Sequence, residues 1–160
     1  MKKVIVATAI IFIFSCAYSQ SVVQVKCKDY KGYIFPKEHS IWGLTPEYNR
    51  YTPSIEDIAQ AEKILRTFVR KGYINTNKDG CCKVPINKRT LKKYMRQYVG
   101  YLTERGNIII HIFLNKDIDM DKNNLSEDIL AVFDGEINHW SIKINISTEE
   151  LFDLQINGIG

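Results

Sequence analysis

An apolar stripe at helical spacing marks the clearest element of the chain. Ile58, Ala61, Leu65 and Phe68 recur every three or four positions, so they share one face of a helix. Residues that favour a helix start precede the stripe, and Gly72 follows it. The pattern predicts a helix over residues 53–71.

From about Tyr94 onward the period changes to two, which is the spacing of a β-strand. Turn residues such as Gly106 and Gly135 divide this region. A Val-rich alternation near the start of the chain predicts one earlier strand. The expected strands cover residues 21–27, 96–102, 107–114, 129–133, 140–146 and 152–156.

The late strands alternate strictly between apolar and polar residues. Ile142, Ile144 and Ile146 alternate with lysine, asparagine and serine, which is typical of an antiparallel sheet with one solvated side. Residues 30–53 are aromatic and interrupted by prolines, so we expect no regular element there. The fold class predicted is α+β, with one long helix packed on an antiparallel four- to five-stranded meander sheet in a single domain over residues 20–160.

The first 19 residues have the three parts of a signal peptide. Lys2 and Lys3 give a positive start, and residues 4–14 form an uncharged run that is apolar except for Thr8. Eleven residues are too few for a bilayer core, which needs roughly 20. Ala17 and Ser19 are small residues at the expected cleavage positions. The pattern predicts a signal peptide over residues 1–19, a periplasmic or secreted protein, and no transmembrane segment after removal of this leader.

A cysteine beside the cleavage site leaves a second reading of the leader open. Ser15 precedes Cys16 as a small residue does in a lipobox, although Phe14 is a poor fit. Lipidation of Cys16 would make the protein a lipid-anchored structural component of the envelope.

Charge and composition exclude several classes of protein. The chain of 160 residues is 45% hydrophobic and 25% charged, so disorder and coiled coil are excluded. The formal net charge is +4, and the leader supplies Lys2 and Lys3. A mature chain so close to neutral gives no electrostatic reason to expect nucleic acid as a partner.

Export makes a disulfide permissible. Cleavage of the leader leaves Cys27, Cys81 and Cys82, and we expect Cys27 to pair with one of the adjacent two. A bond between Cys81 and Cys82 themselves strains the intervening peptide. The adjacent pair lacks the spacing of a zinc site. A catalytic thiol needs a nearby base, and the three histidines, His39, His111 and His139, are scattered along the sequence.

A run of alternating acids has the ligand spacing of a calcium-binding loop. Asp117, Asp119, Asp121 and Asp128 match its alternating ligand positions and its last one. Lys122 replaces the glycine that the tight turn requires. A solvated acidic connection therefore competes with calcium binding, and no other cofactor is expected.

Three segments carry a resemblance to known proteins. They are residues 51–62 (Tyr-Thr-Pro through Ala-Glu), 96–101 (Arg-Gln-Tyr-Val-Gly-Tyr) and 153–158 (Asp-Leu-Gln-Ile-Asn-Gly). In these the chain resembles uncharacterised, exported, small α+β proteins of Bacteroidetes-type bacteria, a resemblance that implies no activity. The order of helix and strands is similar to the cystatin-like arrangement, whose members inhibit papain-like proteases. The inhibitory Gln-x-Val-x-Gly hairpin of that family is not matched. After Gln97, the glycine (Gly100) comes one position too early, and it lies inside a predicted strand.

A second row of large side chains on one strand predicts a binding surface. Ile109, His111 and Phe113 alternate with an isoleucine-rich row, yet the solvated face of a sheet is normally polar. Either residues 30–53 cover this row, or it is an exposed patch with Arg96 and Tyr98 as neighbours.

The function expected from the sequence is an exported, non-enzymatic binding domain for an unknown protein, peptide or surface ligand. The main alternative is a small exported hydrolase, with its site built from the aromatic segment 30–53 and the sheet. The lipid-anchored envelope component described above is the third class.

Overall fold

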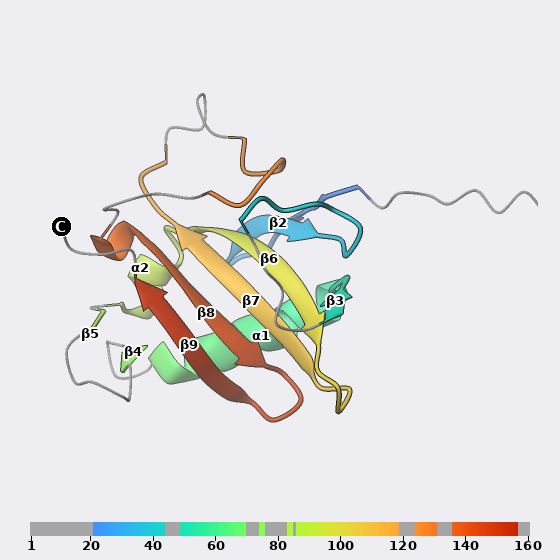
Figure 1. The fold of residues 1–160 in the computed structure, drawn as a ribbon. Coiled ribbons are helices and arrows are strands. Elements are labelled where there is room, and N and C mark those ends of the chain that lie inside the picture. Colours follow the sequence, from blue (N-terminus) through green and yellow to red (C-terminus); the bar gives the residue numbers. More distant parts are fainter. Residues whose placement is uncertain are drawn as a thin grey trace, which may run out of the picture.

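Over the residues that it describes, the computed structural model contains a seven-stranded mixed sheet, a 14-residue helix and a separate two-stranded pair (Figure 1). The described residues are 21–43, 49–69, 74–75, 83–84, 86–118, 124–130 and 136–156. The strands of the large sheet are β1 (Val23–Lys26), β2 (Lys31–Phe35), β3 (Asn49–Tyr51), β6 (Met95–Leu102), β7 (Ile108–Asn115), β8 (His139–Asn145) and β9 (Glu150–Ile156). The remaining elements are α1 (Ile55–Phe68), α2 (Lys88–Leu91), the 3₁₀ helix η2 (Glu136–Asn138) and the paired strands β4 (Ile74–Asn75) and β5 (Lys83–Val84).

The large sheet has the order β1-β2-β6-β7-β8-β9, and β3 also pairs with β6. Strand β2 runs parallel to β6, with Gly32 beside Arg96, whereas all other neighbours are antiparallel. β2 and β3 therefore follow one another along the same side of β6.

The predicted fold, one long helix on an antiparallel four- to five-stranded meander, is wrong. Residues 30–53 supply β2 and β3, although prolines led us to expect no regular element there. These strands have five and three residues, which is too short to show a clear alternation. They form because β6 offers both strands a free edge. Conversely, the sequence predicts a strand that includes Ile129 and Leu130, and the structure places both residues outside any strand.

Helix α1 begins at Ile55, two residues after the predicted start at Pro53. Ser54 caps the helix, since its hydroxyl accepts a hydrogen bond from the Asp57 amide at 3.1 Å while the Asp57 carboxylate accepts from the Ser54 amide at 2.8 Å. Thr52, which precedes Pro53, does not cap the helix, and its hydroxyl accepts a hydrogen bond from the Lys37 amide at 2.9 Å. The helix ends at Phe68. None of the helices in the described part of the chain is long and apolar enough to cross a membrane.

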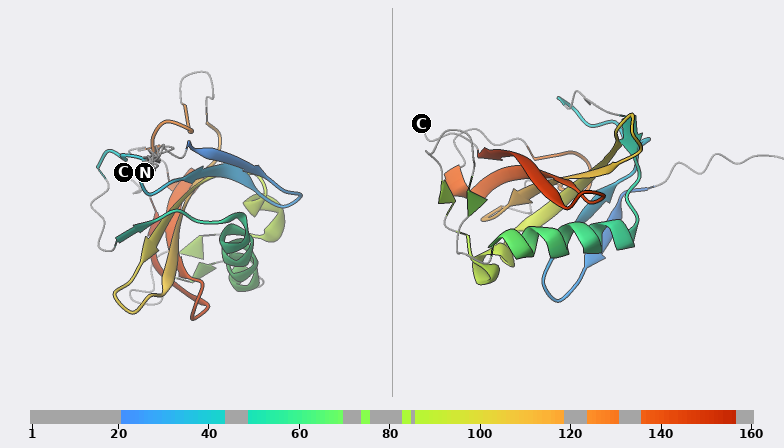
Figure 2. Two further views of the ribbon diagram at one scale, coloured as in Figure 1. Left: turned by 90° about the vertical axis from the view of Figure 1, so that its right-hand side faces the viewer. Right: turned by 90° about the horizontal axis from the view of Figure 1, so that it is seen from below.

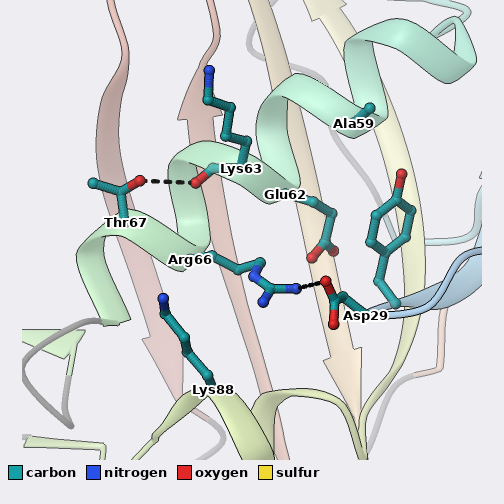
Figure 3. A pocket seen from close by; sticks show the side chains of 8 residues that line it. Asp29, Ala59, Glu62, Lys63, Arg66, Thr67 and Lys88 are labelled. Carbon is teal, nitrogen blue, oxygen red and sulfur yellow. Dashed lines mark hydrogen bonds and ion pairs between the residues drawn. The ribbon is translucent and has the colours of Figure 1, made fainter.

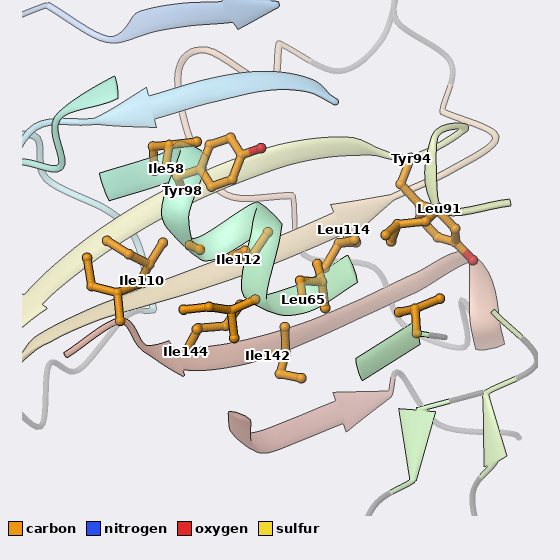
Figure 4. Packing of buried hydrophobic residues seen from close by; sticks show 14 of the residues in the cluster. Ile58, Leu65, Leu91, Tyr94, Tyr98, Ile110, Ile112, Leu114, Ile142 and Ile144 are labelled. Atoms are coloured by element: carbon orange, nitrogen blue, oxygen red, sulfur yellow. The ribbon is translucent and has the colours of Figure 1, made fainter. Parts of the chain in front are cut away.

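The main core lies between α1 and one face of the sheet, and Figure 2 shows the helix crossing that face. Ile58 and Leu65 of the predicted stripe point into it, whereas Phe68 remains half exposed. Buried side chains from β6, β7 and β8 meet the helix (Figure 4). The buried residues that these three strands supply to the core are Tyr98, Ile110, Ile112, Leu114, Trp140, Ile142 and Ile144.

The opposite face of the sheet is also covered, at least over β6 and β7. Phe35 and Ile41, from the aromatic segment, pack on Val99, Tyr101 and Ile109. The covered face corrects the expectation of one solvated side. It agrees with the alternative in which residues 30–53 cover the row that contains Ile109, His111 and Phe113.

A glutamine on β6 attaches a second loop to this face. The Gln97 amide nitrogen donates to the carbonyls of Leu125 and Asp128 at 2.8 and 2.7 Å. The amide oxygen accepts from the Leu130 amide at 3.0 Å and from Asn115 Nδ2 at 3.2 Å. All the hydrogen-bonding positions of a primary amide are thereby used.

A bulge in β9 changes which of its residues face the core. The register with β8 shifts between Ser141 and Lys143, and Asp153 takes a positive φ of 51°. Phe152 therefore leaves the row that contains Leu154 and is 36% exposed. The simple alternation predicted for this strand fails because a bulge inserts one extra residue.

Candidate functional site

The residues predicted to form one binding surface lie on opposite faces of the sheet. Arg96 and Tyr98 face α1, whereas Ile109, His111 and Phe113 face the loops on the other side. Only Phe113 is more than slightly exposed. The structure therefore does not bring the five together as an exposed patch.

Strand register explains this separation. Val99 lies opposite His111, and Gln97 lies opposite Phe113. Residues directly opposite each other in an antiparallel pair share a face. Odd-numbered residues of β6 are thus the neighbours of the predicted row. The alternation of side chains along β6 does not by itself decide which of its two rows lies beside Ile109, His111 and Phe113.

His111 is buried without a hydrogen-bond partner among the described residues. Its side chain is 5% exposed, and both ring nitrogens are unpaired. The ring lies 4.0 Å from that of Phe113. Burial, reinforced by the Lys143 ammonium and opposed by Asp153, lowers its pKa to about 3. At neutral pH this side chain is an uncharged imidazole.

Arg96, on the other face, belongs to a buried charged cluster. Its Nε lies 3.0 Å from Glu62 Oε1, which also accepts a hydrogen bond from the Tyr98 hydroxyl at 2.9 Å. Arg96 Nη1 donates to the Tyr94 carbonyl at 2.5 Å. Burial and the nearby Glu62 carboxylate raise the pKa of Tyr98, so that it remains a neutral donor. Within the described residues, Glu62 Oε2 and Arg96 Nη2 lack partners.

A pocket of about 380 Å³ opens on the outer side of this cluster, and Glu62 forms part of its lining. It lies between α1, the β1–β2 turn and α2 (Figure 3). The lining residues are Asp29, Tyr30, Ala59, Glu62, Lys63, Arg66, Thr67 and Lys88. Glu62 is only 1% exposed, so its carboxylate lies beneath the pocket surface and the neighbouring side chains form the accessible walls.

The accessible walls are rich in cations. Arg66 forms an ion pair with Asp29, and Lys92 reaches the same carboxylate at 2.7 Å. The contacts with Lys92 and Arg66 hold the pKa of Asp29 below its usual value. Lys63 and Lys88 are exposed, and neither has an acidic partner in the described part of the chain.

Sequence reasoning missed this pocket, although one signal was present. Glu62 stands four residues after Ile58 and three before Leu65, so the acid falls within the apolar stripe. An acid on a buried helix face requires a basic or hydrogen-bonding partner. Only the tertiary structure identifies that partner as Arg96.

The predicted calcium ligands are only partly described. Asp119 and Asp121 lie outside the described residues. Asp117 pairs with Lys116 at 3.1 Å, and the Asp128 carboxylate accepts from the amides of Ile129 and Trp42 at 2.8 and 3.3 Å. No group of three potential metal ligands occurs among the residues described.

The predicted disulfide and leader also fall largely outside the described residues. Cys27 is an exposed thiol with no disulfide in the described part of the chain. Cys81, Cys82, Cys16 and the signal peptide over residues 1–19 are not described, so the bridge, the cleavage and the lipidation stay predictions.

No protein-family model, no curated protein and no solved structure matches this chain.

Proposed function

We propose that the chain is an exported, non-enzymatic binding domain, and that the pocket over Glu62 holds the anionic group of a peptide or small-molecule ligand. The observation that carries the proposal is the pair of exposed cations, Lys63 and Lys88, at a pocket that also contains Arg66. The volume of about 380 Å³ suits a small ligand or one side chain of a peptide.

The base of the pocket favours binding because it is held in place before a ligand arrives. Glu62, Arg96 and Tyr98 are each at most 1% exposed and are joined by hydrogen bonds. They fix the position of the helix turn that carries Lys63 and Arg66. A pre-organised site loses less conformational entropy on binding.

The hydrolase alternative has less support. His111 is the buried histidine on the face that segment 30–53 covers, yet neither ring nitrogen contacts a hydroxyl or a carboxylate within the described residues. A general base needs hydrogen-bond reach to its nucleophile.

A neutralisation experiment tests the proposal. The probes are inorganic phosphate and a triglutamate peptide, titrated calorimetrically against the wild type and the double variant Lys63→Gln/Lys88→Gln. We expect the variant to bind both probes about tenfold more weakly, because exposed charges each contribute about 0.2–1 kcal/mol. We also expect added salt to weaken binding to the wild type, since these cations are exposed.

The control is Lys37→Gln/Arg105→Gln, which removes the same charge from exposed residues outside the pocket lining. Equal weakening in the control and in the pocket variant would show a general charge effect and reject the site. The proposed function is rejected if phosphate and the triglutamate peptide both fail to bind the wild type and also fail to bind a variant in which the pocket acid Asp29 is replaced by asparagine.

A further inference from the structure

An acid of the protein itself occupies part of this cationic pocket. Asp29 lies in the turn between β1 and β2, which the hydrogen bond from the Cys27 amide to the Tyr30 carbonyl closes at 2.8 Å. Its carboxylate contacts Arg66 of α1 and also Lys92, which follows α2. Figure 3 shows the Arg66 guanidinium pointing at the Asp29 carboxylate, with the ion pair drawn between them.

We propose that Asp29 is an internal substitute for the ligand, which exchanges places with a dianionic group such as a phosphomonoester. This inference rests on the proposed function and names the chemical class of its ligand. The exchange releases Asp29 to solvent and leaves Arg66 and Lys92 to the incoming anion.

The contacts of Asp29 are of a kind that a ligand can replace. The side chains of Asp29, Arg66 and Lys92 are 31, 27 and 43% exposed. Ion pairs at such exposure are weak, because water solvates each partner well. Asp29 nevertheless has the advantage of being tethered, which gives it a high effective concentration at the cations.

A ligand must therefore gain contacts that Asp29 does not make. Lys63 and Lys88 provide them, since both line the pocket and neither pairs with an acid among the described residues. A monocarboxylate only reproduces the charge of Asp29. A phosphomonoester brings nearly two charges and three acceptor oxygens, and it can bind the Arg66 guanidinium through two parallel hydrogen bonds.

Removal of the internal anion tests the exchange. We expect Asp29→Asn to bind inorganic phosphate about tenfold more tightly than the wild type, because the competitor is gone. The matched control is Glu56→Gln, the same change of charge at an exposed residue of α1 that does not line the pocket. Only a small effect, about twofold, is expected from a change in the general field.

A second measurement follows Asp29 directly in the wild type. Carbon-detected NMR titration of its carboxyl group gives the pKa with and without phosphate. Since Lys92 and Arg66 hold this pKa down, exchange is expected to raise it towards the ordinary value. An unchanged carboxyl titration under saturating phosphate would overturn the exchange.

The ligand class has its own comparison. Acetate is expected to bind the wild type at least about tenfold more weakly than phosphate, and equal affinities would overturn the preference for dianions. A phosphoserine tripeptide and glycerol 3-phosphate present the same group on a peptide and on a small molecule. Tighter binding of either one than of inorganic phosphate assigns the source, and binding of neither overturns the phosphomonoester class.

The outcomes separate the two proposals. If Lys63→Gln/Lys88→Gln loses phosphate binding while Asp29→Asn behaves like Glu56→Gln, the anion site stands and the exchange is wrong. If neither the wild type nor Asp29→Asn binds phosphate or the triglutamate peptide, the proposed function fails and the exchange fails with it.

Discussion

Glu62 Oε1 lies 3.0 Å from Arg96 Nε, and this ion pair joins α1 to the central strand β6 inside the core. The two side chains are 1 and 0% exposed. A buried pair of this kind gains little relative to apolar residues, but loss of one partner leaves an unpaired charge in an apolar environment. The pair therefore favours the one placement of α1 on the sheet in which Glu62 meets Arg96.

Glu62→Gln is expected to lower the free energy of unfolding by about 3–5 kcal/mol, because Arg96 then keeps a buried charge without its counterion. Urea unfolding followed by circular dichroism measures the change. The double variant Glu62→Leu/Arg96→Met removes both charges and is expected to recover most of the loss. A double variant less stable than Glu62→Gln would contradict this account.

Stability is expected to fall between pH 6.5 and pH 4 because of His111. Its pKa is about 3 in the folded protein against an ordinary value of 6.5, so in this range the unfolded chain binds a proton that the folded protein does not. Stability that is present at neutral pH is thus lost as the pH falls, by about 2–3 kcal/mol.

The matched measurement for His111 uses His111→Leu, a variant without a titrating group. Urea unfolding at pH 7, 5 and 4 compares the two proteins. The variant is expected to lose less stability over this range. Burial also lowers the pKa of His139, so a residual slope is expected in both. Parallel curves for the two proteins would exclude His111 as the cause.

Gly100→Ala is expected to destabilise the pairing of β3 with β6. A Cβ at this position would lie 2.6 Å from the Tyr51 carbonyl oxygen and 2.8 Å from Pro53 Cγ. Since the obstacle is backbone and a proline ring, the strand must move, at a cost of about 1–3 kcal/mol. The control is Gly106→Asn in the β6–β7 turn. A Cβ there would have no non-neighbouring atom of the described residues within 4 Å, and asparagine tolerates the φ of 77°. Thermal unfolding ranks the two, and equal losses would refute the clash.

Gln97→Leu is expected to loosen residues 124–130 from the sheet. The change leaves the buried carbonyl of Leu125 and the amide of Leu130 without their partner, which costs at least about 2 kcal/mol. Hydrogen exchange of the Leu130 amide should become at least about tenfold faster. Gln24→Leu, at an exposed position of β1, serves as the control and is expected to leave this exchange rate unchanged.

Export predicts a defined mature N-terminus. Cleavage after Ser19 gives a chain that starts at Gln20, whereas lipidation gives one that starts at a modified Cys16. Intact-mass spectrometry of protein expressed with its leader in a Gram-negative bacterium separates these forms. We expect the mass of the chain that begins at Gln20. A chain that keeps Met1 would contradict export.

The sequence by itself determined the elements whose signal is local. The spacing of Ile58 and Leu65 predicted α1, and alternation predicted β6, β7 and β8 to within two residues at each end. These signals work because side-chain direction follows directly from the helical or extended backbone. The burial of Ile142 and Ile144 follows for the same reason.

Tertiary structure alone decided the rest. β2 and β3 exist because β6 offers them an edge, and the bulge at Asp153 turns Phe152 away from the core. The pocket combines the β1–β2 turn with α1 and α2, segments that are far apart in the chain. Strand register and the pairing of Glu62 with Arg96 both depend on contacts between residues far apart in the sequence. Local periodicity does not specify which segments meet, so it carries no information about these contacts.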